Sequence, residues 1–338
     1  MNRTLLWDIT YECNLRCVHC YNHSRLGDHD SSIIDVLQED ELVKRILSLG
    51  VDHIHLLGGE PLRENRIDRY LRRFKTEGLS VSVNTNGTLI NKYERELLHY
   101  ADQITISLDG ADAKSNDAIR GEGVFDKVIR NVELFTDSIN KNKMGPSLQI
   151  AVVLNAVNYL YIHKLPELLN SIGVNNLLVS RLYECSDSGI DYSGLHLDAK
   201  LYIKSLVRLL YMCYQFGVKL YIDCKPKVAK YLKETTGFNI EILSEYASCQ
   251  AGHRFIYMNN KGNLFPCSPF SHERNCQKWN IADDDYIINF HQLSEVVLKQ
   301  QSAKKDPICS ACEFFYVCAP CNICGESDID LCKYIVRN

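Results

Sequence analysis

The stretch LLWDITYECNLRCVHC, residues 5–20, joins a short apolar run to three cysteines that lie within eight residues. The run LLWDIT is expected to form a β-strand, because short apolar runs with β-branched and aromatic residues favour strands. Cys13, Cys17 and Cys20 follow in the turn that leaves this strand. Three thiols cannot all pair as disulfides, and they leave a four-ligand metal site one ligand short. A function for this stretch has to account for the missing fourth ligand.

The alternation of apolar runs and helical patterns continues over the first 216 residues. Six runs predict strands: LLWDIT, HIHLL, LSVSVN, QITISL, LQIAVVLN and NNLLVS. Helical patterns cover about 38–49, 64–77, 91–100, 124–140, 161–172 and 198–216. Such repeats predict an α/β fold with a parallel sheet. Six units are too few for a closed eight-fold barrel, so we expect a partial (β/α)6 TIM-like barrel whose working residues collect where strands end.

The cysteines divide the chain unevenly. Of 15 cysteines, three lie at positions 13–20 and nine lie between Cys249 and Cys332. We therefore expect a core over residues 1–216, a bridging region over 217–248 and a C-terminal cysteine-rich iron–sulfur domain over 249–338. The two dense groups of thiols predict two metal-binding regions separated by a scaffold.

Composition excludes several kinds of partner. The formal net charge of -4 lacks the basic footprint that nucleic-acid binding requires. No apolar run approaches the roughly 20 residues needed to cross a membrane, and the N-terminal residues lack the features of a secretory signal. We expect a cytoplasmic protein. A reducing compartment favours metal ligation or catalysis by its thiols over lasting disulfides.

The spacing C-x3-C-x2-C of Cys13, Cys17 and Cys20 resembles that of the radical S-adenosylmethionine (radical SAM) enzymes. Three thiolates on a four-iron cluster leave one iron open to a small molecule. In that family the open iron of a [4Fe-4S] cluster binds S-adenosylmethionine, whose reductive cleavage gives a 5′-deoxyadenosyl radical that removes a hydrogen atom from the substrate. His19 stands where the family usually has another aromatic residue. A zinc knuckle completed by His23 is the competing interpretation.

Glycines follow the second predicted strand in the sequence GGEP, residues 58–61. Gly58 and Gly59 leave the backbone bare for a ligand, and Glu60 offers a carboxylate to an ammonium group. The sequence resembles the family's GGE motif, which holds the methionine amino group of the cofactor. An ordinary strand-to-helix turn is the alternative.

The turns NTNG and SLDG end the third and fourth predicted strands. The resemblance implies that Asn84 and Ser107 lie near the ribose and carboxylate of the cofactor, and that Asp109 turns toward the substrate. Each is also an ordinary turn sequence. Arg120 matches an arginine often seen in the family, where it would anchor the cofactor carboxylate or the substrate; an exposed arginine is the alternative. Rim positions after strands five and six hold Asn155, a candidate cofactor contact, and Arg181.

The C-terminal cysteines resemble the SPASM extension of some radical SAM enzymes. The residues RFIYMNNKGNLFPC predict a hairpin that would bring Cys249 and Cys267 together. The resemblance implies one or two auxiliary clusters of the [4Fe-4S] type. One would use Cys309, Cys312, Cys318 and Cys332, and the other Cys249 and Cys267 with a further cysteine. The family's spacing points to position 322, which is Asn here. Three alternatives are open: Cys321, Cys324 or both supply the ligand, the cluster keeps an open iron, or it holds only two irons. Zinc ribbons are the alternative.

Four thiols fall outside these patterns. Cys213 lies in a helical pattern and suits an apolar filling role. Cys185 and Cys224 follow predicted strands near the open end of the scaffold, and Cys224 is a candidate hydrogen-atom donor. Cys276 is a spare candidate ligand.

Together these features imply a radical SAM/SPASM oxidoreductase that oxidises or cross-links a ribosomally made peptide. An external reductant such as flavodoxin or ferredoxin is implied. The first strand starts within ten residues, so we expect a separate leader-peptide-binding protein, an unaided short peptide or a small-molecule substrate. The alternatives are a peptide epimerase that uses a cysteine thiol, a dehydrogenase acting on a small molecule, and a non-enzymatic zinc or iron–sulfur protein.

Overall fold

The computed structural model describes residues 3–28, 32–185, 187–238, 241–242, 251–272, 279–286, 307–314 and 327–337. Strands within these ranges form one sheet in the order β11-β10-β9-β1-β2-β3-β4-β5-β6-β7-β8. Neighbouring strands from β1 to β8 pair in parallel. The expected α/β fold with a parallel sheet is confirmed.

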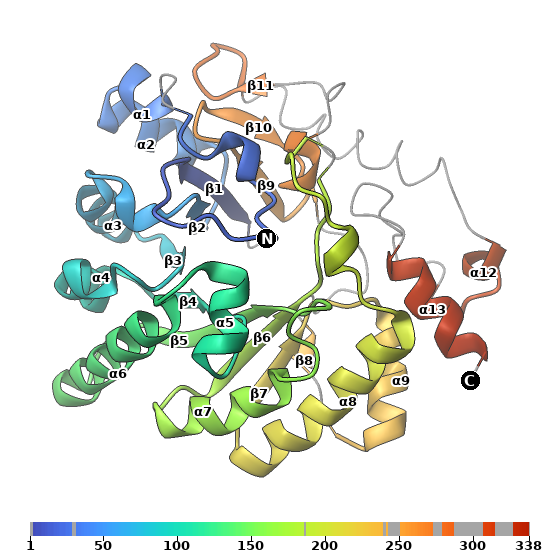
Figure 1. Cartoon of the computed structure of the whole chain (residues 1–338). Helices are drawn as coiled ribbons and strands as arrows, with labels where there is room; N and C mark the ends of the chain where they lie inside the picture. The colour runs from blue at the N-terminus through green and yellow to red at the C-terminus, as the bar shows by residue number, and fades with distance from the viewer. Residues whose placement is uncertain are drawn as a thin grey trace.

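All six strands expected from the sequence are present. They are β1 (Thr4–Thr10), β2 (His53–Gly58), β3 (Ser80–Thr85), β4 (Gln103–Ser107), β5 (Ser147–Val153) and β6 (Asn176–Ser180). The expected helical patterns contain α2 (Glu39–Ser48), α3 (Ile67–Thr76), α4 (Glu94–Tyr100), α6 (Val124–Asn142), α7 (Leu165–Ser171) and α8 (Ala199–Phe216). Figure 1 shows these helices following one another in an arc outside the sheet.

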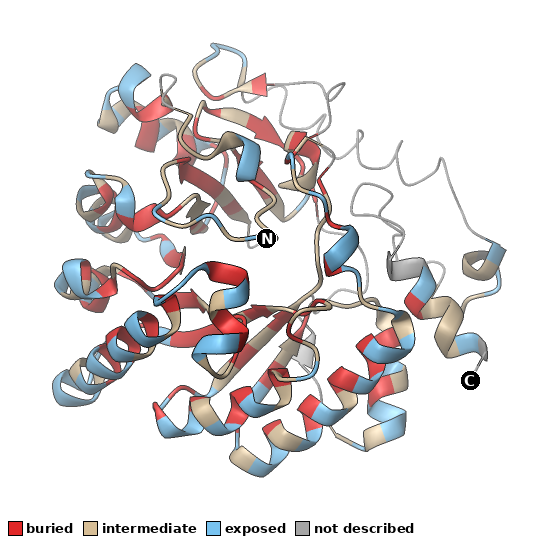
Figure 2. Ribbon diagram, in the orientation of Figure 1, coloured by how far each residue is buried: buried red, intermediate tan, exposed pale blue. Residues whose placement is uncertain are grey.

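The core lies between the sheet and this arc of helices. Trp7 of β1 is completely buried and meets the rings of Tyr70 and Phe74 of α3, at centroid distances of 5.7 and 6.2 Å. The buried residues of α3 recur every three or four positions, as a helix with one apolar face requires. In Figure 2 the buried residues of the helices lie on the sides that face the sheet.

On the opposite face of the sheet, β2 and β3 carry polar side chains. Side chains alternate along each strand, so His55 lies on the face opposite the buried Ile54 and Leu56. His55 Nε2 lies 3.2 Å from Asn84 Oδ1, and the neighbouring His53 Nε2 lies 2.8 Å from Ser82 Oγ. Burial lowers the pKa of His55 to about 4, so this imidazole is neutral at pH 7.

The sheet continues through all three expected segments of the chain. The bridging region supplies β7 (Lys219–Ile222), α9 (Pro226–Thr236) and β8 (Glu241–Ile242). The C-terminal segment supplies β9 (Phe255–Met258), β10 (Asn263–Phe265) and β11 (Trp279–Asn280). Strand β9 pairs in parallel with β1, and β10 pairs antiparallel with both β9 and β11. Where the domain boundaries lie stays a prediction.

The predicted hairpin around NNKG is confirmed, with Leu264 opposite Met258. Asn259 Oδ1 accepts hydrogen bonds from the N–H groups of Lys261 and Asn263, at 3.1 and 2.9 Å, and closes the turn. The partner residue Cys249 lies outside the described residues.

The remaining described helices are short or terminal. They are α1 (Ile33–Val36), α5 (Ala113–Arg120), α12 (Pro307–Ser310) and α13 (Ser327–Arg337), with 3-10 helices at His23–Arg25, Pro61–Arg63, Ile90–Tyr93, Ile162–Lys164, Ser193–Leu195 and Pro269–His272. Helix α13 packs against α8 and α9. Within the described ranges, no helix has the length and apolar character to cross a membrane.

Candidate active site

The three N-terminal cysteines lie on the loop that follows β1. Cys13, Cys17 and Cys20 are free thiols and are half-buried. The N–H of Cys20 donates to the carbonyl of Cys17 at 3.2 Å, and the N–H of Val18 donates to Ile119 O of α5 at 3.0 Å. Burial raises the pKa of all three thiols, that of Cys20 to about 12. Ionised sulfur at this depth requires a positive partner, so the donor set suits an iron–sulfur cluster.

Two side chains direct N–H groups at these sulfur atoms. Asn86 Nδ2 lies 3.9 Å from Cys13 Sγ, and Arg120 Nη1 lies 3.9 Å from Cys17 Sγ. Asn86 belongs to the turn after β3, and Arg120 is the last residue of α5. N–H donors at cluster sulfurs stabilise the negative charge there. The sequence had pointed to the NTNG turn but not to Asn86 within it.

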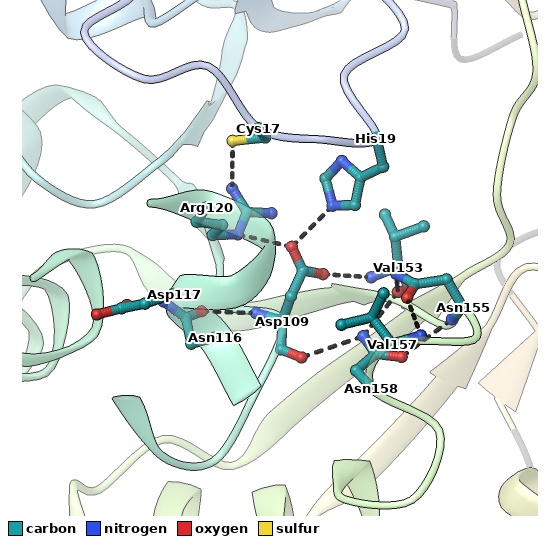
Figure 3. A network of polar contacts seen from close by, with 10 residues as sticks. All are labelled: Cys17, His19, Asp109, Asn116, Asp117, Arg120, Val153, Asn155, Val157 and Asn158. Carbon is teal, nitrogen blue, oxygen red and sulfur yellow. Dashed lines mark hydrogen bonds and ion pairs between the residues drawn. The ribbon is translucent and has the colours of Figure 1, made fainter. Parts of the chain in front are cut away.

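Asp109 is the centre of a buried polar network beside the cysteine loop (Figure 3). Its Oδ2 lies 2.8 Å from His19 Nε2 and forms an ion pair with Arg120 Nε at 2.7 Å. Its Oδ1 accepts a hydrogen bond from Val153 N at 2.8 Å. Burial alone would raise the pKa of Asp109, but Arg120 and His19 outweigh it and lower that pKa to about 2. The carboxylate is fully buried, so a direct contact with a substrate would require one of these partners to move.

Asparagines hold the backbone of Asp109 in place. The N–H of Asp109 donates to Asn116 Oδ1 at 3.0 Å, and its carbonyl accepts from Asn158 Nδ2 at 3.1 Å. Asn155 is fully buried, and its side chain closes its own turn by donating to Val153 O and accepting from Val157 N, both at 2.9 Å. These bonds explain Asn155 structurally, and a cofactor contact by Asn155 stays a prediction.

Gly58 and Gly59 run directly against the start of the cysteine loop. The N–H of Gly59 donates to Thr10 O and the N–H of Glu60 donates to Glu12 O, both at 2.8 Å. A Cβ atom on Gly58 or Gly59 would overlap the carbonyl oxygen of Thr10 or Glu12. The glycines therefore permit the contact that positions the residues before Cys13. A contact of Gly58 and Gly59 with a cofactor stays a prediction.

The Glu60 carboxylate is fully buried and joins the ends of two strands. Oε1 accepts from Leu62 N at 3.1 Å and from Thr85 Oγ1 at 2.6 Å, and Oε2 accepts from Asn86 N at 2.7 Å. Burial raises the pKa of Glu60. The side chain thus holds the turn that directs Asn86 at Cys13, and its predicted bond to a ligand ammonium stays a prediction.

Asn84, Ser107 and Arg181 reach the same edge of the sheet. Asn84 Oδ1 is engaged by His55. Ser107 is half-buried at the end of β4, and its hydroxyl makes no side-chain hydrogen bond to any part of the chain that the structure describes. Arg181 Nε lies 3.7 Å from Asp223 Oδ2, and the guanidinium stacks 4.9 Å from the Tyr183 ring centroid. The structure therefore brings Asn84, Ser107 and Arg181 to the expected edge, and the contacts of Asn84 and Ser107 with a cofactor stay predictions.

The end of the cysteine loop is attached to the segment that follows Cys267. Arg25 Nη1 donates to Ser271 Oγ at 2.9 Å, and Nη2 donates to Ser271 O at 2.6 Å. Nη2 also lies 3.4 Å from Asp187 Oδ2, and Asp187 in turn bonds His272 Nδ1. Sequence patterns contain no signal for this junction, because its partners are far apart along the chain.

A third buried carboxylate, Asp8, lies next to the same loop. Asp8 of β1 is completely buried and accepts hydrogen bonds from Asn22 Nδ2, at 2.9 Å, and from Tyr257 OH of β9. Burial raises the pKa of Asp8 to about 6, the opposite of the shift at Asp109. The available sequence signal was an acidic residue inside the apolar run LLWDIT.

The C-terminal ligands are only partly covered by the described residues. Cys267, Cys309, Cys312 and Cys332 are half-buried. The other C-terminal cysteines lie outside the described ranges: Cys249, Cys276, Cys318, Cys321 and Cys324. The ligand sets of the auxiliary clusters therefore stay predictions.

The unassigned thiols lie in the core scaffold. Cys185 and Cys213 are buried, and Cys224 is half-buried just before α9. Burial raises the pKa of Cys213 and of Cys224 to about 12. Both side chains are therefore neutral thiols at pH 7.

Several known proteins are similar to this chain in sequence or in fold. Residues 7–169 match the family model of the radical SAM superfamily. Mycofactocin maturase MftC of Mycolicibacterium smegmatis is 26% identical over 323 residues, which cover 93% of this chain and 76% of that protein. AdoMet-dependent heme synthase of Methanosarcina barkeri is 25% identical over 335 residues, covering 94% and 90%.

A solved structure supports the fold along most of the chain. Streptococcus suis SuiB bound to S-adenosylmethionine superimposes with a TM-score of 0.74 at 20% identity, covering 96% of this chain and 73% of SuiB. SuiB bound to its precursor peptide SuiA superimposes with a TM-score of 0.72 at 19% identity, covering 96% and 72%. The expected partial barrel is thus the fold of this chain.

Proposed function

We propose that this chain, whose residues 7–169 match the family model of the radical SAM superfamily, removes a hydrogen atom from a ribosomally made peptide and thereby oxidises or cross-links it. The observation that carries the proposal is the loop with Cys13, Cys17 and Cys20, half-buried at the edge where the parallel strands end. Donors from two neighbouring elements approach its sulfur atoms. A zinc knuckle would not need these surroundings.

The three cysteines would hold a [4Fe-4S] cluster, as the family implies. When bound, that cluster supplies the electron that cleaves S-adenosylmethionine to a 5′-deoxyadenosyl radical. The residues of the chain bind and orient the reactants. Ser107 offers a hydroxyl for the cofactor carboxylate, and Arg120 offers a guanidinium at the same edge.

A peptide substrate is supported by the relatives. MftC is a maturase and SuiB binds the precursor peptide SuiA. We propose a separate leader-peptide-binding protein or a short unaided peptide as partner, and a flavodoxin or ferredoxin as the cytoplasmic reductant. The heme synthase of Methanosarcina barkeri, which aligns over 90% of its length, supports a small molecule as the second candidate substrate.

Auxiliary clusters would serve an oxidation, because a substrate radical that has lost a hydrogen atom must then lose an electron. We propose ligation by Cys309, Cys312, Cys318 and Cys332 at one cluster. Cys249 and Cys267 would ligate the other, with Cys321, Cys324 or both. These assignments make the chain an oxidoreductase.

Epimerisation is the alternative favoured by one observation. A hydrogen-atom donor must carry its S–H hydrogen, and burial keeps the Cys224 thiol protonated. If the enzyme oxidises or cross-links its peptide, Cys224→Ala should leave the product unchanged. If it is an epimerase that uses Cys224 as hydrogen-atom donor, Cys224→Ala should abolish epimerisation. Cys213→Ala is the matched control, because Cys213 is also a buried neutral thiol.

Anaerobic reconstitution tests the proposal. Full-length protein with iron, sulfide, dithionite and S-adenosylmethionine should yield 5′-deoxyadenosine, and Cys17→Ala should abolish it. Addition of a precursor peptide encoded by a neighbouring reading frame should give a product that lacks two hydrogen atoms. An unchanged mass in H2O, together with the gain of one solvent deuterium at a Cα in D2O, would indicate epimerisation instead. Bound zinc without sulfide would overturn the proposal.

A further inference from the structure

A single carboxylate oxygen joins the cysteine loop to α5. Asp109 Oδ2 lies 2.8 Å from Nε2 of His19, which stands between Cys17 and Cys20, and 2.7 Å from Nε of Arg120. From the other side of the same guanidinium, Arg120 Nη1 lies 3.9 Å from Cys17 Sγ. Figure 3 shows Arg120 between Asp109 and Cys17. The Arg120 guanidinium therefore lies between the Asp109 carboxylate and the Cys17 sulfur and contacts both.

Solvent screens these charges very little. The side chains of Asp109, Arg120 and His19 are 0%, 7% and 8% exposed. Charges in such surroundings interact more strongly than in water, and a buried charge that loses its partner is costly. The negative charge of Asp109 therefore offsets a positive charge that would otherwise act on the sulfur of Cys17.

The carboxylate is held by the scaffold and not only by the loop. Val153 N of β5 donates to Oδ1 at 2.8 Å. Asn116 of α5 and Asn158 bond the N–H and carbonyl of Asp109, at 3.0 and 3.1 Å. These bonds place the Asp109 carboxylate independently of His19 and Arg120, so it provides a fixed point to which both are drawn.

We propose that Asp109 is a positioning residue that holds Arg120 toward Cys17 and offsets its charge, and so keeps low the reduction potential of the cluster on Cys13, Cys17 and Cys20. Hydrogen bonds to the sulfurs and the net charge nearby set such potentials. Loss of the carboxylate charge leaves a buried cation beside the cluster, which favours the reduced state. The cluster then becomes easier to reduce and a weaker reductant. This role goes beyond the proposed peptide modification and is independent of the substrate.

The test is the variant Asp109→Asn in the full-length, anaerobically reconstituted protein. The readout is a redox titration of the electron paramagnetic resonance signal that changes when S-adenosylmethionine is added. We expect a more positive potential, with about a tenfold larger ratio of reduced to oxidised cluster at a fixed solution potential, or about 59 mV for one electron. Absence of any such signal in the wild type would count against the proposed function itself, whereas failure with a peptide would not affect this test.

Asp112→Asn is the matched control. Asp112 caps α5 by accepting a hydrogen bond from Ser115 N at 2.8 Å, and Asn preserves such a cap. The substitution makes the same change of charge three positions away, and it should leave the potential unchanged.

The double variant Asp109→Asn/Arg120→Gln removes both charges and separates electrostatics from general damage. We expect its potential to return toward that of the wild type. A wild-type potential in Asp109→Asn, or an unreversed shift in the double variant, would overturn the proposal. If Asp109→Asn fails to hold a cluster, the double variant should regain it, because the unpaired guanidinium is gone; continued failure would also overturn the proposal.

Discussion

Glu60 Oε2 accepts a hydrogen bond of 2.7 Å from the backbone N–H of Asn86, and this bond holds in place the turn whose amide approaches Cys13. We expect Glu60→Gln to lower the free energy of unfolding by about 1–3 kcal/mol, because an amide would turn an N–H group toward one of three existing donors. Urea unfolding measures the loss. Glu41→Gln is the control, because it removes the charge of an exposed carboxylate that pairs with Arg45. It should leave the unfolding midpoint unchanged. Equal midpoints for the two variants would contradict the role of Glu60.

The close approach of Gly59 to the cysteine loop predicts a steric effect. Gly59→Ala should lower the free energy of unfolding by about 2 kcal/mol or more, because the new Cβ would overlap Glu12 O. Iron content after reconstitution should fall with it, since the same contact positions the loop. Gly194→Ala is the control, because its Cβ would meet no atom within 4 Å. A Gly59→Ala protein with wild-type stability and iron content would show that the loop adjusts freely.

Asp8 predicts a pH dependence of stability. Its folded pKa of about 6 lies above the ordinary value of 3.8, so folding favours the protonated form. The corresponding stabilisation is complete below the unfolded pKa and is lost as pH rises through 6; a shift of this size corresponds to roughly 3 kcal/mol.

Comparison with Asp8→Asn isolates this contribution, because other groups titrate in both proteins. The free energy of unfolding of the wild type should fall relative to that of the variant between about pH 4 and 6, and level off above. Urea unfolding across this range is the measurement. A difference that stays constant with pH would mean that Asp8 does not change its protonation as the buried site requires.

The hydrogen bonds from Arg25 to Ser271 should protect the backbone amides after Cys267 from hydrogen exchange. Arg25→Met should raise amide hydrogen exchange in residues 268–272, because two hydrogen bonds to Ser271 are lost. Arg69→Met is the control, since Arg69 is 62% exposed and pairs with Glu39 at the surface. Unchanged exchange in residues 268–272 would indicate that the hairpin alone orders this segment.

Short-range patterns determined much of the fold. Apolar residues recur with the period of a strand or a helix along each segment, so six strands, six helices and the NNKG hairpin were predictable one segment at a time. Helix α5 was missed because its sequence, AKSNDAIR, contains one large apolar residue, Ile119, and so has no apolar periodicity. Its available signal was the capping residue Asp112. The expected class of chemistry likewise came from a local feature, the spacing of Cys13, Cys17 and Cys20.

Only the tertiary structure decided which groups face the thiols. The contact of Tyr257 with Asp8 joins residues 249 positions apart, and that of His19 with Asp109 joins residues 90 apart. Each depends on which strands are neighbours in the sheet and on which side chains are buried together, and no local period encodes either. The sequence by itself therefore determined six parallel strands, six helices, the hairpin and the three N-terminal thiols. Only the tertiary structure placed Arg120 between Asp109 and Cys17. The strength of such a buried ion pair depends on the distance between the charges and on the exclusion of water, and both are set by packing.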